Sequence, residues 1–211
     1  VLIVGWDDQK VTAANYPGAW IVKNSWGQSW GEAGYFYLSY HDSIGVENPA
    51  VFPSRMNYEP RAVIHGHDEM GWMMPYGWSD GTDQAAVKFL PSADERILSI
   101  GTYVQAVGSV LDVEIYDDFD GSLFSGLLGS EADVYCDHAG YHTIELTQPP
   151  DVLEGDDFFV KIVYQTGTPY TIPIEGFIEG YSSHVEIPDS GHCWMSDDGS
   201  SWCAFGVGTG R

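Results

Sequence analysis

Short apolar stretches dominate the first forty residues. Residues 1–6 form a continuous apolar run, which is typical of a strand buried on both faces. A polar segment follows at 7–17, and two further runs, at 18–22 and 35–40, are rich in the aromatic and β-branched residues that favour strands. The pattern therefore predicts three strands in this part of the chain.

Beyond Gly71 the pattern changes to short strands that alternate apolar and polar positions, separated by turns rich in Gly, Asp and Ser. Val113 and Ile115, for example, alternate with Glu114, which places the apolar side chains on one face. No segment shows the periodicity of an amphipathic helix. We expect strands at 85–90, 96–104, 111–116, 141–146, 158–164 and 171–178, and a final pair flanking Asp198-Gly199. Such a succession is typical of a β-sandwich or jelly roll.

Residues 44–64 separate the two patterns and follow neither. Pro49, Pro53 and Pro60 recur there without strand or helix periodicity. The sequence thus predicts a mainly β protein with an N-terminal segment at 1–43, a linker at 44–64 and a β-sandwich domain at 65–211.

The chain is strongly acidic. Its 211 residues include 8 Lys and Arg against 31 Asp and Glu, a formal charge of −23 at pH 7. This charge repels phosphate backbones and anionic lipid headgroups, so we expect no nucleic-acid partner. Acidity with scarce lysine also suits life at high salt, an explanation we favour over a ligand. No apolar run is long enough to span a bilayer and residues 1–4 lack the features of a signal peptide, so we expect a soluble chain without a membrane span.

Three cysteines, Cys136, Cys193 and Cys203, are too few for a disulfide scaffold and lack the paired spacing of a zinc site. If Asp198-Gly199 lies in a three-residue hairpin loop, Cys193 faces Cys203 and Trp194 faces Trp202 across the strands. A disulfide and two free thiols both remain open for that pair.

No metal and no cofactor are expected. Residues 65–69 read His-Gly-His-Asp-Glu, but in a linker-like segment these side chains would have no fixed geometry. The acidic stretch 117–121 fails as a calcium loop, because taking Asp118 as the first position puts Leu123 at the glycine position. We predict an ordinary acidic turn there.

Four tryptophans of the second half have two interpretations. Their rings could stack on a sugar, or they could be packing residues of the core and turns, which we favour given the area that an indole buries. They are Trp72, Trp78, Trp194 and Trp202.

The segment 24–35 carries the most specific signal. It reads Asn-Ser-Trp-Gly-Gln-Ser-Trp-Gly-Glu-Ala-Gly-Tyr and predicts a rigid loop between two strands, with tryptophans too large to leave exposed. Asn24 is its one polar side chain placed to orient a partner; alternatively it satisfies local backbone as a turn residue.

This segment closely resembles the asparagine-containing signature of papain-like cysteine peptidases, and it matches all eight fixed letters. Residues 1–6 look like the strand that follows the catalytic His in that family, whose domain is α+β. The His would lie two residues before Val1, and the nucleophilic Cys far upstream. His41 has no family counterpart, and we expect it at the surface.

The resemblance implies the roles of two site residues. In the family a thiolate paired with an imidazolium attacks the peptide carbonyl, and the asparagine fixes the ring tautomer. Asn24 would hold that role, and Trp26 would shield the Asn–His hydrogen bond from water. Because the Cys and His are absent, we expect these 211 residues to be inactive alone.

The second half resembles the lectin-like β-sandwich appended to papain-type peptidases of some archaea and bacteria. The residues that carry this resemblance are Ile115-Tyr116, Ser125-Gly126, 140–146, 153–156 and 196–202. These are turn and core positions, so they indicate the fold and say little about a ligand.

Two functional hypotheses follow. The first is the C-terminal part of a secreted or cell-surface papain-like cysteine endopeptidase, which hydrolyses peptide bonds by a Cys-His-Asn mechanism. Its partners would be a peptide or protein substrate, the remaining peptidase segment with the catalytic Cys and His, from the same gene or a separate chain, and a glycan or cell-surface ligand. The sandwich would provide surface attachment or support the cleft. The second is a non-catalytic carbohydrate-binding or adhesion module.

Overall fold

The computed structural model describes residues 1–43, 51, 62–67, 72–176 and 191–205. The chain divides into two compact units, Val1–Tyr58 and Glu59–Arg211. Every regular element in the described residues is a strand, which confirms the mainly β class. Most of the predicted linker, 44–64, lies outside the described residues.

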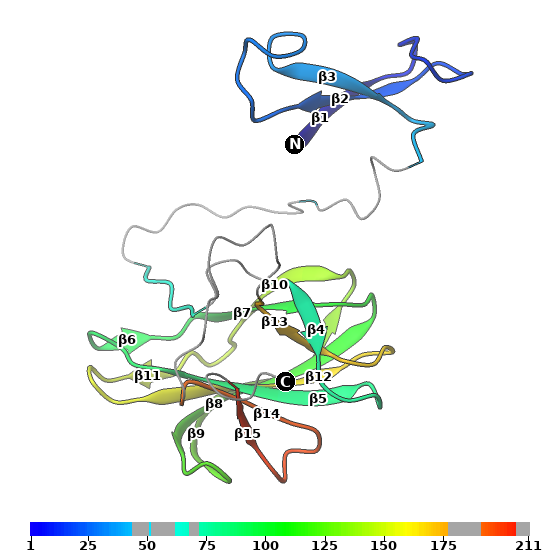
Figure 1. The fold of residues 1–211 in the computed structure, drawn as a ribbon. Coiled ribbons are helices and arrows are strands. Elements are labelled where there is room, and N and C mark those ends of the chain that lie inside the picture. Colours follow the sequence, from blue (N-terminus) through cyan, green and yellow to red (C-terminus); the bar gives the residue numbers. More distant parts are fainter. Residues whose placement is uncertain (44–50, 52–61, 68–71, 177–190, 206–211) are drawn as a thin grey trace. The chain divides into compact units, whose positions relative to one another are not determined.

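The first unit contains a three-stranded antiparallel sheet in the order β1-β2-β3 (Figure 1). Its strands are β1 (Leu2–Asp7), β2 (Ala19–Lys23) and β3 (Tyr35–Ser39), as the apolar pattern predicted. The expectation that the first strand is buried on both faces is wrong: Leu2 is 56% exposed and Val4 49%. The reason is that, among the described residues of this unit, no helix or second sheet covers β1.

The second unit is built on a six-stranded antiparallel sheet in the order β15-β14-β5-β12-β8-β9. Its strands are β5 (Thr82–Phe89), β8 (Ser109–Phe119), β9 (Phe124–Cys136), β12 (Phe158–Gln165), β14 (Cys193–Ser196) and β15 (Cys203–Phe205). In β8 the side chains of Leu111, Val113 and Ile115 are fully buried, whereas Glu114 is only partly so. The two-residue alternation therefore assigned the core face correctly.

Three two-stranded sheets complete this unit. They pair β7 (Ser99–Val104) with β10 (Gly140–Glu145), β4 (Met74–Tyr76) with β13 (Ile172–Ile174), and β6 (Glu95–Arg96) with β11 (Asp151–Val152). In Figure 1 the first two pairs lie on one side of the six-stranded sheet. Ile100 and Val104 of β7 share a core with Leu111 and Val113 of β8, as a sandwich requires.

A buried polar contact also joins the layers of the sandwich. The Thr102 hydroxyl of β7 and the Tyr164 hydroxyl of β12 lie 2.7 Å apart, with either able to donate. Both side chains are buried, so the bond satisfies two groups that would otherwise be costly inside an apolar core.

Several predicted elements have different bounds. The run 96–104 is interrupted after Arg96, so it forms β6 and β7, and of the run 171–178 only Ile172–Ile174 is a strand, residues 177 and 178 lying outside the described part. The sequence pattern did not predict β4, β9 and β11. The longest of these, β9, has two register shifts against β8 and contains Gly126, whose φ is 66°, so its side chains do not alternate regularly.

The last hairpin corrects the predicted cysteine register. Cys193 lies opposite Phe205, and Cys203 lies opposite Met195, because the loop is longer than three residues. Within that loop Ser196 Oγ accepts a hydrogen bond from Gly199 N at 2.9 Å, and Asp198 Oδ1 accepts one from Ser200 N at 2.9 Å. Cys203 is a free thiol, and the expected Cys193–Cys203 and Trp194–Trp202 pairings are wrong.

The sequence predicted no membrane span. In the part of the chain that the structure describes, no helix has the length and apolar character needed to cross a bilayer.

Candidate functional site

Asn24 lies directly after β2, at the base of the loop that leads into β3. Its backbone N–H donates to the carbonyl of Gly34 at 2.9 Å, which closes the loop. Its side-chain Oδ1 accepts a hydrogen bond from Ser25 N at 2.9 Å, and the residue is half-buried. The local backbone contact expected of a turn residue is therefore present, whereas the orienting role remains a prediction.

The loop conformation requires glycine. Gly31 and Gly34 have φ values of 58° and 92°, in the left-handed region. A Cβ at Gly31 would lie 2.5 Å from the carbonyl oxygen of Tyr35, closer than real contacts allow. Gly34 N in turn donates to Trp30 O at 2.7 Å. These positions fix the backbone on which Asn24 depends.

The tryptophans of the loop are held edge to face. The Trp26 and Trp30 ring centroids are 5.1 Å apart, and those of Trp30 and Phe36 are 5.6 Å apart, both in T-shaped geometry. Trp26 nevertheless exposes 68% of its surface, so the expectation that both indoles would be buried is wrong for Trp26. In the first unit as described, nothing covers its outer surface, although a packed neighbour orients the ring.

The first unit contains no cysteine nucleophile of its own. Its sequence has no cysteine, and its one histidine, His41, is exposed and contacts Tyr16 at 5.5 Å between ring centroids. The exposure of His41 confirms the sequence prediction. An amide and an indole can orient and shield a reacting group but cannot attack a carbonyl.

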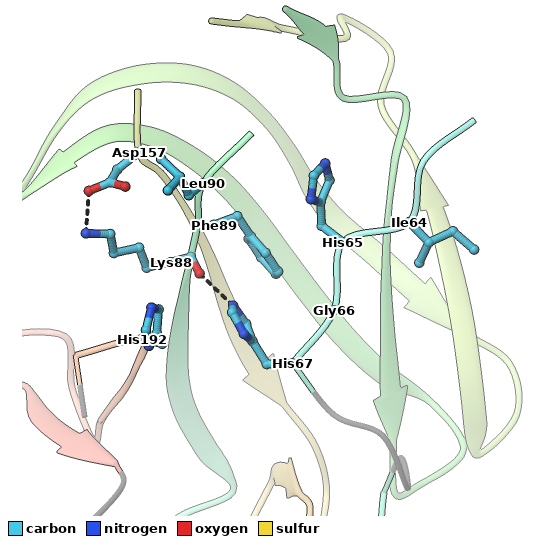
Figure 2. Close-up of a pocket in the computed structure, with 9 residues that line it drawn as sticks. All are labelled: Ile64, His65, Gly66, His67, Lys88, Phe89, Leu90, Asp157 and His192. Atoms are coloured by element: carbon cyan, nitrogen blue, oxygen red, sulfur yellow. Dashed lines mark hydrogen bonds and ion pairs between the residues drawn. The ribbon is translucent and has the colours of Figure 1, made fainter. Parts of the chain in front are cut away.

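A second candidate site is a pocket of about 350 Å³ in the second unit (Figure 2). It is lined by residues 64–67, by residues 88–90 at the end of β5, and by Asp157 and His192. These segments are far apart in the sequence, so no local motif could have predicted the pocket.

Two histidines fix one wall of this pocket. His65 Nε2 lies 2.6 Å from Glu95 Oε2, and His67 Nε2 lies 2.8 Å from the backbone oxygen of Lys88. The expectation that these imidazoles have no fixed geometry is therefore wrong, because the sandwich supplies acceptors for them. Asp68 and Glu69, the rest of that sequence cluster, lie outside the described residues.

An aromatic ring and an ion pair continue the lining beside these histidines. Phe89 stacks on His67 at 5.0 Å and on Phe158 at 5.5 Å between centroids. Lys88 Nζ forms an ion pair with the Asp157 carboxylate, shown as a dashed line in Figure 2. The pocket thus presents aromatic surface beside one ammonium and one carboxylate.

An acidic group that the sequence did not suggest lies elsewhere in this unit. Carboxylate oxygens of Asp80, Asp83 and Asp197 lie within 4.8 Å of one another. Burial chiefly, and then the neighbouring charges of Asp80, Asp198 and Asp83, raises the pKa of Asp197. Both Asp83 side-chain oxygens already accept hydrogen bonds from the protein backbone. The three aspartates are therefore interpreted as a structural cluster.

The acidic turn predicted at 117–121 is right only for its end, because Asp117, Asp118 and Phe119 belong to β8 and the chain turns from Asp120 onward. Asp120 Oδ1 accepts hydrogen bonds from Ser122 N and Leu123 N, both at 2.8 Å. These hydrogen bonds lower the pKa of Asp120 below its ordinary value. The bond from Leu123 N has the larger effect and the bond from Ser122 N the smaller.

The four tryptophans of the second half are all partly buried. Trp194 and Trp202 pack edge-on against Phe119 at 5.2 and 5.8 Å, and Trp78 packs against the core. Trp72 lies 6.3 Å from Tyr103 between centroids. These contacts agree with the packing interpretation rather than with exposed sugar platforms.

Two family models match the chain. The lectin like domain model matches residues 64–207, and the papain family cysteine protease model matches residues 1–54.

Curated relatives match short stretches of the chain. Mouse (Mus musculus) cathepsin K is 44% identical over 55 residues, which are 25% of this chain and 15% of cathepsin K. A cysteine protease of Blomia tropicalis is 43% identical over 49 residues, 23% of this chain and 13% of that protein. The chain therefore spans only a small part of the curated relatives that it matches.

Two solved structures match nearly the whole chain. A clostridial cysteine protease, Cwp84, after propeptide cleavage matches with a TM-score of 0.69 and 17% identity, over 99% of this chain and 53% of that one. The cysteine protease and lectin-like domains of Cwp84, described as a surface layer associated protein of Clostridium difficile, match with a TM-score of 0.60 and 19% identity, over 96% and 46%. At these identities the likeness concerns the fold.

Proposed function

This chain belongs to the lectin-like domain family and carries a papain-family segment before that domain, and we propose that it is part of a cysteine endopeptidase that cleaves peptide bonds by a Cys-His-Asn mechanism. Within that peptidase, residues 1–43 supply the asparagine loop, 44–64 the linker and 65–211 the lectin-like domain. The catalytic Cys and His come from the remaining peptidase segment, on the same polypeptide or a separate chain.

The observation that carries this proposal is the asparagine loop itself. All eight fixed letters of the signature occur in residues 24–35, and the glycines among them hold a backbone that other residues would strain. A loop that restricts several positions to glycine, with Asn24 at its base, is expected where a side chain must be held in one defined position.

Asn24 is proposed to orient the catalytic imidazole. Its Oδ1 accepts one hydrogen bond, from Ser25 N, and an amide oxygen has two lone pairs, so it can accept a second from a ring N–H. That bond fixes the tautomer whose other nitrogen faces the thiolate. Trp26, held by Trp30 and otherwise exposed, is proposed to cover this bond and exclude water, which strengthens it.

The lectin-like domain is proposed to hold the peptidase at the cell surface, through a glycan or another surface ligand, or to support the cleft. The description of Cwp84 as surface layer associated supports an extracellular or cell-surface location. The net charge of −23 adds no support for a cell-surface location, because an acidic composition is also typical of proteins from high-salt habitats.

The test is peptide hydrolysis by the longer polypeptide that supplies the Cys and His. We expect Asn24→Ala to lower kcat/KM about 10²-fold, because misplacing a catalytic group by a small distance reduces the rate by about that factor. Gln28→Ala, an exposed change in the same loop, should leave kcat/KM unchanged. The 211-residue chain alone should show no mechanism-based labelling by a thiol-reactive peptide probe, which is distinguished from simple alkylation of the exposed Cys203.

Other results would contradict the proposal. Equal kcat/KM for Asn24→Ala and the unmodified enzyme would remove the orienting role. A parent polypeptide without a cysteine nucleophile would reject the mechanism and favour the adhesion module. Mechanism-based labelling of the 211-residue chain by the probe would reject the proposed need for the upstream Cys and His.

A further inference from the structure

We propose that the pocket lined by residues 64–67, 88–90, Asp157 and His192 binds an uncharged sugar ring of a glycan. This inference rests on the proposed surface attachment and gives it a site and a ligand class. The pocket lies within one unit, so it does not depend on how the two units are placed.

The first argument is the rigid apolar wall. His67 and Phe89 line the pocket and stack at 5.0 Å between ring centroids. Phe158, a buried core residue that does not line the pocket, stacks on Phe89 at 5.5 Å and holds that ring in place. Leu90, which is 61% exposed, extends this wall. Apolar surface held in one conformation suits the C–H face of a sugar, because binding orders no further side chain.

The second argument is the polar edge. Lys88 is an ammonium with three donor hydrogens, and Asp157 is a carboxylate with several acceptor positions. Their ion pair holds both groups at the pocket, with side chains 28% and 38% exposed. Since each has hydrogen-bonding capacity beyond the pair, together they can serve neighbouring hydroxyls that both donate and accept.

The third argument is charge, which selects against ionic ligands. Lys88 and Asp157 compensate each other, so the pocket has no uncompensated fixed charge to bind an anion or a cation. An anion would meet the Asp157 carboxylate and the overall charge of −23, whereas a cation would meet the Lys88 ammonium. A neutral polyhydroxyl compound has neither penalty.

The fourth argument is space. A volume of about 350 Å³ lies at the lower end of the roughly 300–1,000 Å³ typical of small-molecule sites. Gly66 lines the pocket, and a Cβ added there would meet no atom within 4 Å (Figure 2 shows its bare backbone beside His65 and His67). The space beside the Gly66 backbone is therefore free for a ligand to occupy.

The same glycine provides the test. Gly66→Phe adds a ring at the pocket without a clash at its Cβ or a left-handed backbone. Gly167→Phe is the matched control, since Gly167 also has nothing within 4 Å of an added Cβ and does not line the pocket. Near-UV circular dichroism of both variants checks that the fold is retained.

The probes are methyl glucoside, methyl galactoside, methyl mannoside and N-acetylglucosamine, with glucuronate and glucosamine as charged counterparts of the same ring. Titrations of the full 211-residue chain are followed by NMR of the histidine ring signals. We expect at least one neutral sugar to bind with a millimolar Kd and to shift signals of His67 and His192. Gly66→Phe should weaken binding at least about tenfold, and Gly167→Phe should not change it. Asp157→Asn should also weaken binding, because one acceptor oxygen is replaced by an NH2 donor and the ion pair that holds Lys88 is lost.

The outcomes separate the site from the function. A neutral sugar that binds Gly66→Phe as well as the unmodified chain overturns the pocket but leaves glycan attachment intact. Tighter binding of glucuronate or glucosamine than of the neutral sugars overturns the ligand class. Absence of binding by every probe and by a glycan array overturns both the pocket and glycan attachment, while the peptidase proposal is judged by the Asn24→Ala kinetics.

Discussion

At the scale of single residues, Asp83 shows how this sandwich accommodates a buried polar side chain. It is fully buried, and its carboxylate accepts hydrogen bonds from Trp78 N at 2.9 Å, Thr171 N at 2.8 Å and Thr171 Oγ1 at 2.7 Å. Gly77 packs so closely that a Cβ there would lie 2.2 Å from Asp83 Oδ2. The carboxylate thus joins the start of β5 to the segment before β13, because a buried polar side chain needs all its partners.

We expect Asp83→Ala to lower the free energy of unfolding by about 3 kcal/mol, because it leaves buried backbone donors without acceptors. Asp80→Ala, an exposed change in the same acidic group, should cost less than about 0.5 kcal/mol. Urea denaturation of both variants measures the difference. Equal midpoints for the two variants would show that Asp83 carries no structural role.

At the scale of elements, an ion pair between side chains reinforces the ladder of the two-residue strands β6 and β11. Arg96 Nε donates to Asp151 Oδ1 at 2.7 Å, and a terminal nitrogen of the same guanidinium donates to Oδ2 at 3.0 Å. This paired geometry is the strong form of an Arg–carboxylate contact. The hydrogen bond from Arg96, followed by its charge, lowers the pKa of Asp151, although burial opposes the shift.

The lowered pKa predicts a pH dependence with a definite sign. A folded-state pKa below the unfolded value of about 3.9 contributes stability that is present above that value and lost as the pH falls through the folded pKa. Asp151→Asn should therefore lower the thermal midpoint slightly at neutral pH, by an amount that salt reduces, since the pair is exposed. The two midpoints should converge below about pH 4. A constant difference down to strongly acidic pH would argue against this clamp.

At the scale of the whole molecule, the two units differ in how much apolar surface they bury. The second unit has a continuous core shared by its sheets. In described residues 1–43 the buried apolar side chains are Ala19 and Val22, while Leu2, Ile3 and Trp6 remain exposed. Since burial is the main source of stability, the first unit should open far more easily.

Amide hydrogen exchange on the 211-residue chain tests this contrast. We expect β1, β2 and β3 to exchange quickly and β8 and β12 to be the most protected strands. Adding the peptidase segment that supplies the Cys and His should slow exchange in β1 to β3. Strong protection of these strands in the 211-residue chain alone would be inconsistent with missing contacts.

The sequence predicted β8 and β12 because apolar side chains alternate there with residues of the other face, such as Glu114 and Lys161. It did not predict β9, because bulges and Gly126 break the alternation and the strand is held by pairing with β8. Likewise the Asn24 loop was recognised from twelve contiguous residues, whereas the exposure of Trp26 depends on what packs around it.

The sequence by itself determined the mainly β class, the separation into two patterns and the asparagine loop, because these depend on neighbours along the chain. Only the tertiary structure decided the register of the last hairpin, the burial of Asp83 and the pocket that joins His67, Lys88 and Asp157. The hairpin register depends on how its loop folds. The other two depend on contacts between segments distant in sequence, which are fixed by packing and pairing across the sandwich rather than by local residue patterns.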